Sequence, residues 1–105
     1  MSFFITSEVK KVAIMTLSGE LDSLSSREFQ AEIEKVAAES PKDLVLLVEN
    51  LSFMSSAGLR VLIFSKQKIG PDLSIYIVKP QPVIVETLEK TGLHHSVNIV
   101  DEYSF

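Results

Sequence analysis

Two adjacent serines, Ser55 and Ser56, follow the most apolar stretch of this 105-residue chain. That stretch, residues 44–48, predicts a buried strand, and the residues after the serines have helical spacing. In open α/β sheets, binding sites are built where the carboxyl ends of strands meet helix amino termini. A phosphate on Ser56 would be favoured there by roughly 0.3 to 1 kcal/mol, because the start of a helix carries partial positive charge. Reversible phosphorylation is therefore the first chemistry that this segment suggests.

The residues around Ser56 allow both a functional and a structural interpretation. Arg60 lies four residues further along the same helical face, where its guanidinium can pair with a phosphate. Ser55 or Ser56 can equally cap the helix, which is the usual role of serine at this position, and both roles can hold at once. Phe53 and Met54 are either surface anchors for a partner or parts of the core.

No set of residues for catalysis or metal binding stands out. His94 and His95 are adjacent, and neighbouring side chains of an extended segment point to opposite faces, which makes a poor chelate. The sequence has no cysteine and no glycine-rich phosphate loop. Nothing near Ser56 in the sequence supplies a base, and we interpret Glu20 and Asp22 as solvated loop residues. We therefore predict no enzyme activity, no metal and no cofactor.

A helix is expected ahead of the buried strand, between Ser25 and the Ser-Pro pair at residues 40–41. Its start is predicted to be a capping box, in which the Ser25 hydroxyl and the Glu28 carboxylate satisfy backbone N–H groups. Leu24 and Phe29 occupy the positions of a hydrophobic staple.

Strands and helices alternate along the rest of the chain, which predicts an α/β fold with right-handed crossovers. A hairpin at the front adds an antiparallel edge, so the sheet is expected to be mixed. Gly92 is predicted to be a left-handed helix cap. The expected elements are a hairpin over residues 3–17, a helix from the serines to residues 70–71, a strand over 73–77, a helix from 80–82 onward, a short strand over 97–100, and a tail over 101–105.

Composition limits the kinds of partner. A length of 105 residues corresponds to one domain, which we expect to span residues 1–105, and 46% hydrophobic residues are typical of a globular protein. The net charge of −4 provides no basic field for nucleic acid. No apolar run approaches the roughly 20 residues that span a bilayer, and no secretory signal is visible. We expect a cytoplasmic protein that binds neither nucleic acid nor a membrane.

Three motifs in order resemble landmarks of one family. They are VENLSFMSSAGL at residues 48–59, GELD at residues 19–22 and TGL at residues 91–93. Together they resemble STAS domains, specifically the stand-alone bacterial anti-anti-sigma factors (anti-sigma factor antagonists) of sporulation and general stress response. The resemblance covers essentially the whole chain. It implies a single STAS-like domain, with a mixed sheet and helices mainly on one face.

The resemblance also implies a partner-switching function in transcription regulation. Such a protein binds an anti-sigma factor that is also a serine kinase, and the sigma factor is released. Phosphorylation breaks the complex until a serine phosphatase removes the phosphate. The matching serine here is Ser56, and Ser55 is the less favoured acceptor. Self-association is expected at most as a weak homodimer. The partner-binding residues that we predict are Asp22, Phe53, Met54, Ser55, Ser56, Gly58, Leu59 and Arg60.

The sequence departs from the family pattern beside the phosphorylated serine. Ser55 stands where the family carries an aspartate, and Arg60 stands where it commonly carries glycine. These departures keep an alternative open, namely a STAS scaffold or regulatory interaction module that is never phosphorylated. The roles of Asp22 and Gly58 also stay open. Asp22 is either a partner contact or a turn carboxylate ahead of the helix, and Gly58 serves either close approach of a partner or packing.

Overall fold

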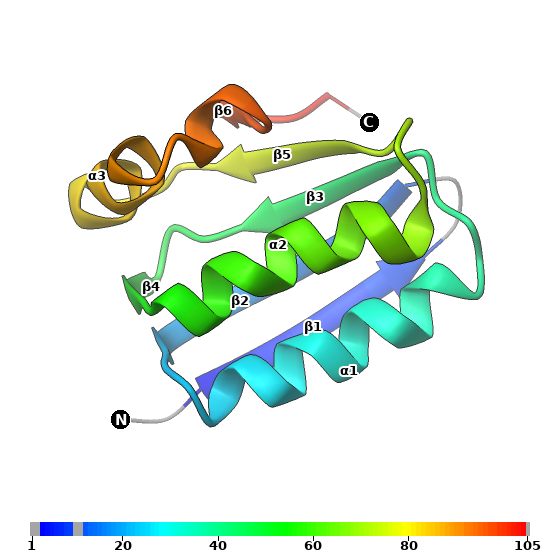
Figure 1. Cartoon of the computed structure of the whole chain (residues 1–105), viewed down its shortest axis with the longest axis horizontal. Coiled ribbons are helices and arrows are strands. Elements are labelled where there is room, and N and C mark those ends of the chain that lie inside the picture. The colour runs from blue at the N-terminus through cyan, green and yellow to red at the C-terminus, as the bar shows by residue number, and fades with distance from the viewer. Residues whose placement is uncertain (1–2, 10–11, 105) are drawn as a thin grey trace.

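A computed structural model describes residues 3–9 and 12–104 of the chain (Figure 1). The described part alternates strands with helices after an initial pair of strands. Its elements are β1 (Phe3–Val9), β2 (Val12–Leu21), α1 (Ser25–Ala37), β3 (Asp43–Leu47), β4 (Leu51–Met54), α2 (Ser56–Ile69), β5 (Ser74–Val78), α3 (Pro82–Lys90), the 3-10 helix η1 (Leu93–His95) and β6 (Asn98–Val100).

The strands form one mixed sheet in the order β1-β2-β3-β5-β6. β1 and β2 pair antiparallel, and every other pairing is parallel. This arrangement confirms the predicted fold class and the hairpin at the front. β2 is longer than expected, because its second half pairs with β4 after β3 has ended.

β4 is a strand that the sequence analysis did not predict. Its four residues do not alternate, since Leu51 and Met54 are buried and the two residues between them are exposed. A strand this short leaves no period-2 pattern to detect. Its effect on the site is large, because β4 carries the chain alongside β2 up to the two serines.

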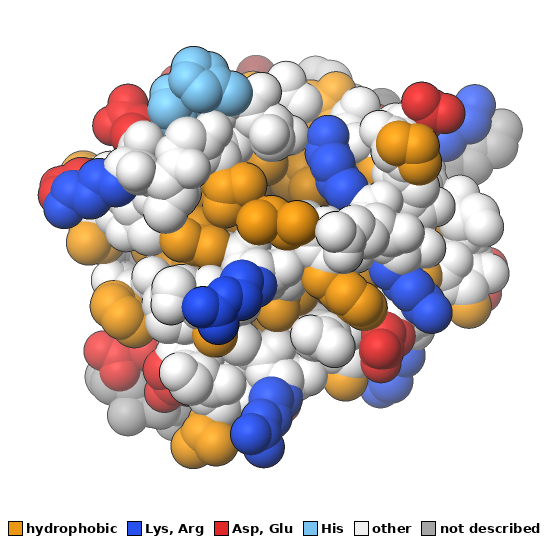
Figure 2. All heavy atoms as spheres, viewed as in Figure 1, with side chains coloured by type: hydrophobic (Ala, Val, Ile, Leu, Met, Phe, Trp, Pro, Cys, Tyr) orange, Lys and Arg blue, Asp and Glu red, His pale blue; other side chains and the backbone are white. Residues whose placement is uncertain are grey.

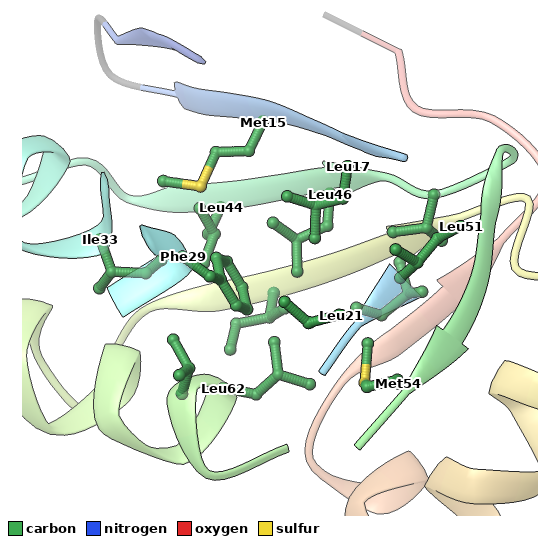
Figure 3. Close-up of a cluster of buried hydrophobic side chains, with 14 of the residues drawn as sticks. Met15, Leu17, Leu21, Phe29, Ile33, Leu44, Leu46, Leu51, Met54 and Leu62 are labelled. Carbon is green, nitrogen blue, oxygen red and sulfur yellow. The ribbon is translucent and has the colours of Figure 1, made fainter. Parts of the chain in front are cut away.

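The hydrophobic core lies between the sheet and the helices. α1 and α2 run side by side across one face of the sheet (Figure 1), and buried residues of α3 join the same core. Alternate residues of β2 point toward the helices, as their complete burial shows. Phe29 of α1 is packed among side chains from the sheet and from α2 (Figure 3). These contacts confirm that the helices lie mainly on one face.

The segment after β6 contacts the other face of the sheet. The Tyr103 hydroxyl donates a hydrogen bond to the Asp43 carboxylate, and its ring meets Tyr76 edge-on with centroids 4.8 Å apart. The hydrogen bond to Asp43 raises the pKa of Tyr103 to about 12. Part of the predicted tail is thereby tied to β3 and β5.

The histidine pair lies in a different local structure from the one predicted. His94 and His95 belong to η1, not to an extended segment, and their ring centroids are 3.8 Å apart. Gly92 just before them has a φ of 76°, which confirms the predicted left-handed cap. Among the described residues, no group of three or more potential ligands is placed to hold a metal.

Candidate functional site

The two segments that carry predicted site residues, one around Asp22 and one around Ser55, meet at the carboxyl edge of the sheet. Leu21 and Met54 are the last residues of β2 and β4, and they are partners in the parallel pairing. The backbone N–H of Ser55 donates to the Leu21 carbonyl at 2.8 Å. Asp22 and Ser55 therefore leave the sheet side by side, and α1 and α2 begin at the same edge (Figure 1).

The backbone assigns the capping role to Ser55. Its φ of −79° and ψ of 169° are extended, and its side chain accepts a hydrogen bond from the backbone N–H of Gly58. The distance between the Ser55 Oγ and the Gly58 nitrogen is 3.3 Å. This geometry is that of a helix N-cap, in which a side-chain oxygen satisfies one of the free N–H groups of the first turn.

Ser56 is the first residue of α2 and its side chain is exposed. Within the described part of the chain, its hydroxyl makes no hydrogen bond. The first turn of α2 contains no acidic residue, so the partial positive charge of the helix start is not neutralised by a carboxylate there. The hydroxyl of Ser56 is thus accessible to an enzyme, and a phosphate at this position would meet a favourable field.

Asp22 holds the start of α1. Its Oδ1 accepts hydrogen bonds from the backbone N–H groups of Leu24 at 3.1 Å and Ser25 at 2.9 Å. The Ser25 hydroxyl lies 2.9 Å from the same oxygen. These bonds, above all those from Ser25, hold the pKa of Asp22 below its ordinary value. The structure thus gives Asp22 the turn role that the sequence left open, and Asp22 directly follows Leu21, whose carbonyl accepts from the Ser55 N–H.

The predicted capping box and hydrophobic staple at α1 are wrong. α1 begins with Leu24 in the cap position and without a side-chain cap. The side chain of Ser25 lies 2.9 Å from the Glu20 carbonyl and does not pair with Glu28. Leu24 is 73% exposed while Phe29 is fully buried, so the two do not form a staple. The end of β2 places Asp22 where it accepts from the Ser25 N–H, one of the two groups that the box was expected to satisfy, and from the Leu24 N–H.

The remaining predicted site residues divide into surface and core. Phe53 is 44% exposed, and Arg60 is also on the surface. Met54 and Leu59 are buried in the core, and Gly58 is buried as well. A Cβ on Gly58 would lie 2.7 Å from the side chain of Leu21, so glycine here permits packing of α2 against β2. Of the predicted partner-binding residues, Met54, Gly58 and Leu59 are therefore buried in this structure, while Phe53 and Arg60 are exposed.

A groove of about 220 Å³ lies between the first halves of α1 and α2, beside Ser56. Arg27 and Ser26 of α1 and Arg60 of α2 are among the residues that line it. Sequence reasoning did not find Arg27, because its relation to Arg60 exists only once the two helices are packed together.

The carboxylate at this edge of the sheet is that of Asp22. A carboxylate that acts as a general base at neutral pH usually has a raised pKa. The pKa of Asp22 is instead lowered by its hydrogen bonds from Ser25. The apolar hollow between α2 and η1 has a volume of about 170 Å³, which is below the roughly 300 Å³ at which ligand pockets usually begin.

Comparison with known proteins decides the family. The family model described as "STAS domain" matches residues 4–104. This chain belongs to the STAS domain family. The anti-sigma-F factor antagonist RsfB of Mycobacterium tuberculosis is 28% identical to this STAS protein over 82 residues, which are 78% of this chain and 67% of RsfB. No helix in the described part of this STAS protein is long and apolar enough to cross a membrane.

Solved structures share the fold. An anti-sigma factor antagonist from Mycobacterium paratuberculosis superposes with a TM-score of 0.82 and 24% identity, covering 96% of this STAS protein and 87% of that chain. SpoIIAA, a Bacillus cell fate determinant solved in its phosphorylated form, has a TM-score of 0.67 and 19% identity over 93% of this protein and 90% of SpoIIAA. At 24% and 19% identity, these two likenesses show that the fold is shared.

Proposed function

We propose that this STAS protein is an anti-sigma factor antagonist whose partner is an anti-sigma factor with serine kinase activity. Binding of the unmodified protein releases the sigma factor, and phosphorylation of Ser56 ends the binding. The name of RsfB and of the Mycobacterium paratuberculosis neighbour supports the first part of the proposal. The observation that carries the second part is the exposed, unbonded hydroxyl of Ser56 at the start of α2.

Electrostatics supports a switch that acts at the partner's surface. A phosphate adds about −1.5 to −2 charges near neutral pH, so the net charge of −4 becomes about −5.5 to −6. The start of α2 accepts this charge, so α2 remains folded. The repulsion therefore arises against the partner, and removal of the phosphate by a serine phosphatase restores binding.

The exposed side chains beside Ser56 complete the proposed contact surface. Asp22 lies next to Ser55 at the sheet edge, and Phe53 offers an exposed aromatic ring. An aromatic side chain that is already held on a strand makes a strong interface anchor, because little conformational entropy is lost on binding. We propose that these residues and Arg60 surround Ser56 in the complex.

The test uses the anti-sigma factor from the organism's own cells and four forms of this protein. We expect the Ser56→Ala variant to bind as tightly as the unmodified protein, even when kinase and ATP are present. We expect Ser56→Asp to bind at least about tenfold more weakly, as burial of an unpaired charge at an interface would produce. Ser55→Asp is the matched control, since it adds the same charge one residue earlier and aspartate is a good N-cap.

A scaffold that is never phosphorylated is the second candidate, because Ser55 stands in place of the family's aspartate and already caps α2. The same binding series separates the two functions. Equal affinity of Ser56→Asp, Ser56→Ala and the unmodified protein for the anti-sigma factor would favour the scaffold and contradict the switch.

A further inference from the structure

Arginine occurs at two positions of this chain, and both lie in the groove between α1 and α2. Of the ten basic residues, eight are lysines and two are arginines, Arg27 and Arg60. Both arginines line the groove together with Gln30, whereas no described lysine does. Figure 2 shows basic side chains over the first halves of α1 and α2, the helices that form the groove. The fold thus brings together two residues that are far apart in the sequence.

Neither arginine forms an ion pair within the part of the chain that the structure describes. The ion pairs that are present involve lysines on α1 and α3. The residues three and four positions away from each arginine in the sequence carry no acidic side chain. They are Ser23, Leu24, Gln30 and Ala31 around Arg27, and Ser56, Ala57, Ile63 and Phe64 around Arg60. The described residues that line the groove thus include two like charges and no acidic side chain, although the whole chain is acidic.

We infer that the groove between α1 and α2 binds an acidic side chain of the protein partner through Arg27 and Arg60. The inference rests on the proposed function, because it places the partner at the edge that carries Ser56. A guanidinium offers a planar fork of N–H donors that matches a carboxylate, whereas a lysine ammonium acts as a point charge. The exposed amide of Gln30 adds a further donor at the same groove.

The volume and position of the groove favour a single side chain as the occupant. A groove of about 220 Å³ accepts one carboxylate-bearing side chain and is too small for a folded segment. It is continuous with the proposed contact surface, because Arg60 lies one helical turn after Ser56 on α2. A carboxylate from the partner would supply the counter-charge that the two arginines lack.

The position of Arg60 also connects the groove with the proposed phosphorylation of Ser56. A phosphate on Ser56 would lie at the i, i+4 position relative to Arg60, where opposite charges on a helix attract. The phosphate would then compete with the partner's carboxylate for the same guanidinium. Phosphorylation would weaken the complex by removing an attraction as well as by adding a repulsion.

The experiment measures the affinity of the unmodified protein and its variants for the anti-sigma factor, at low and high salt. The variants are Arg27→Glu, Arg60→Glu and, as the matched charge reversal, Lys68→Glu, which lies in the last turn of α2. All three side chains are exposed, so the variants should fold. We expect each arginine variant to bind about tenfold or more weakly at low salt, with a smaller loss at high salt. Lys68→Glu should bind like the unmodified protein.

Three results would overturn the inference, and they differ in whether the proposed function survives. If the arginine variants bind as tightly as Lys68→Glu while Ser56→Asp still weakens binding, the groove is not a docking point but the proposed function survives. If an acidic residue of the partner is found at the groove, its replacement by arginine must restore binding of Arg60→Glu, and failure to do so rejects the pairing. If the unmodified protein does not bind the anti-sigma factor, the proposed function and this inference both fall.

Discussion

The starts of α1 and α2 lie at the same sheet edge and each contains a pair of serines, yet the two pairs are used differently. Ser25 and Ser26 are both buried, and their hydroxyls are hydrogen-bonded to the turn that begins at Asp22. At α2, Ser55 makes one capping bond and Ser56 makes none among the described residues. At α1 both hydroxyls form hydrogen bonds that hold the fold, whereas at α2 the Ser56 hydroxyl is exposed and has no hydrogen-bond partner among the described residues.

The largest effect is expected at Gly58, where the start of α2 packs against the ends of β2 and β4. In Gly58→Val, the new Cβ alone would lie 2.7 Å from the side chain of Leu21 and 3.1 Å from that of Met54. We predict a loss of about 2 to 3 kcal/mol in the free energy of unfolding, because overpacking forces buried side chains to shift. Chemical denaturation measures this loss. A variant as stable as the parent would mean that α2 is not held against β2 as described.

Asp22→Ala removes the oxygen that accepts hydrogen bonds from two backbone N–H groups at the start of α1. We predict a lower melting temperature and faster amide exchange in the first turn of α1. The effect depends on pH in a defined direction. Because folding lowers the pKa of Asp22, its contribution is present above the unfolded value of about 3.9 and is lost as pH falls below it.

Acid titration of stability therefore provides the check for Asp22. The unmodified protein should lose stability more steeply than Asp22→Ala as pH falls from about 5 toward 3, in the range of an ordinary aspartate pKa. Equal slopes for the two proteins would show that Asp22 does not hold the helix start in the way proposed.

Ser26→Ala tests whether the buried serine hydroxyls at the start of α1 stabilise the fold. The Ser26 hydroxyl donates to the Asp22 carbonyl at 2.6 Å, and the residue is 4% exposed. We predict a loss of about 1 kcal/mol, the usual net value of a buried hydrogen bond. Differential scanning calorimetry is sufficient to detect it. If Ser26→Ala were as stable as the unmodified protein, the Ser26 hydroxyl would not contribute to stability, and the contrast between the two helix starts would fail at α1.

Ser56→Ala is expected to have the smallest effect on stability, within about 0.5 kcal/mol, because an exposed side chain without a partner is removed. Ser55→Ala, measured beside it, should cost about 0.5 to 1 kcal/mol through loss of the cap. A larger loss for Ser56→Ala than for Ser55→Ala would reverse the assignment of the two serines.

The sequence predicted those elements whose patterns are long or clearly terminated. The helix before Gly70 and the left-handed cap at Gly92 follow from local chemistry, and the structure has both. β4 was missed because its pairing with β2 is non-local and its four residues show no alternation. The capping box was mispredicted because the pattern of Ser25 and Glu28 is local, whereas Asp22 is placed by the end of the strand.

Part of the site could be predicted only as alternatives. Ser55 and Ser56 have the same side chain, and only the extended backbone at Ser55 assigns it the cap. Arg27 and Arg60 line the same groove only because α1 and α2 pack side by side. Their spacing in the sequence does not predict this proximity. The resemblance to STAS domains identified the family, and the structure then divided the motif into buried and exposed residues.

Mass mapping of phosphorylation on the protein from its own cells, growing and stressed, tests the central claim most directly. Cleavage after Lys42 and Arg60 releases one peptide that contains both Ser55 and Ser56, and fragmentation separates the two sites. We predict a single phosphate on Ser56 whose occupancy changes with growth condition. A fully covered peptide without phosphate in every condition, or with phosphate on Ser55 alone, would contradict the assignment of Ser56 as the switch.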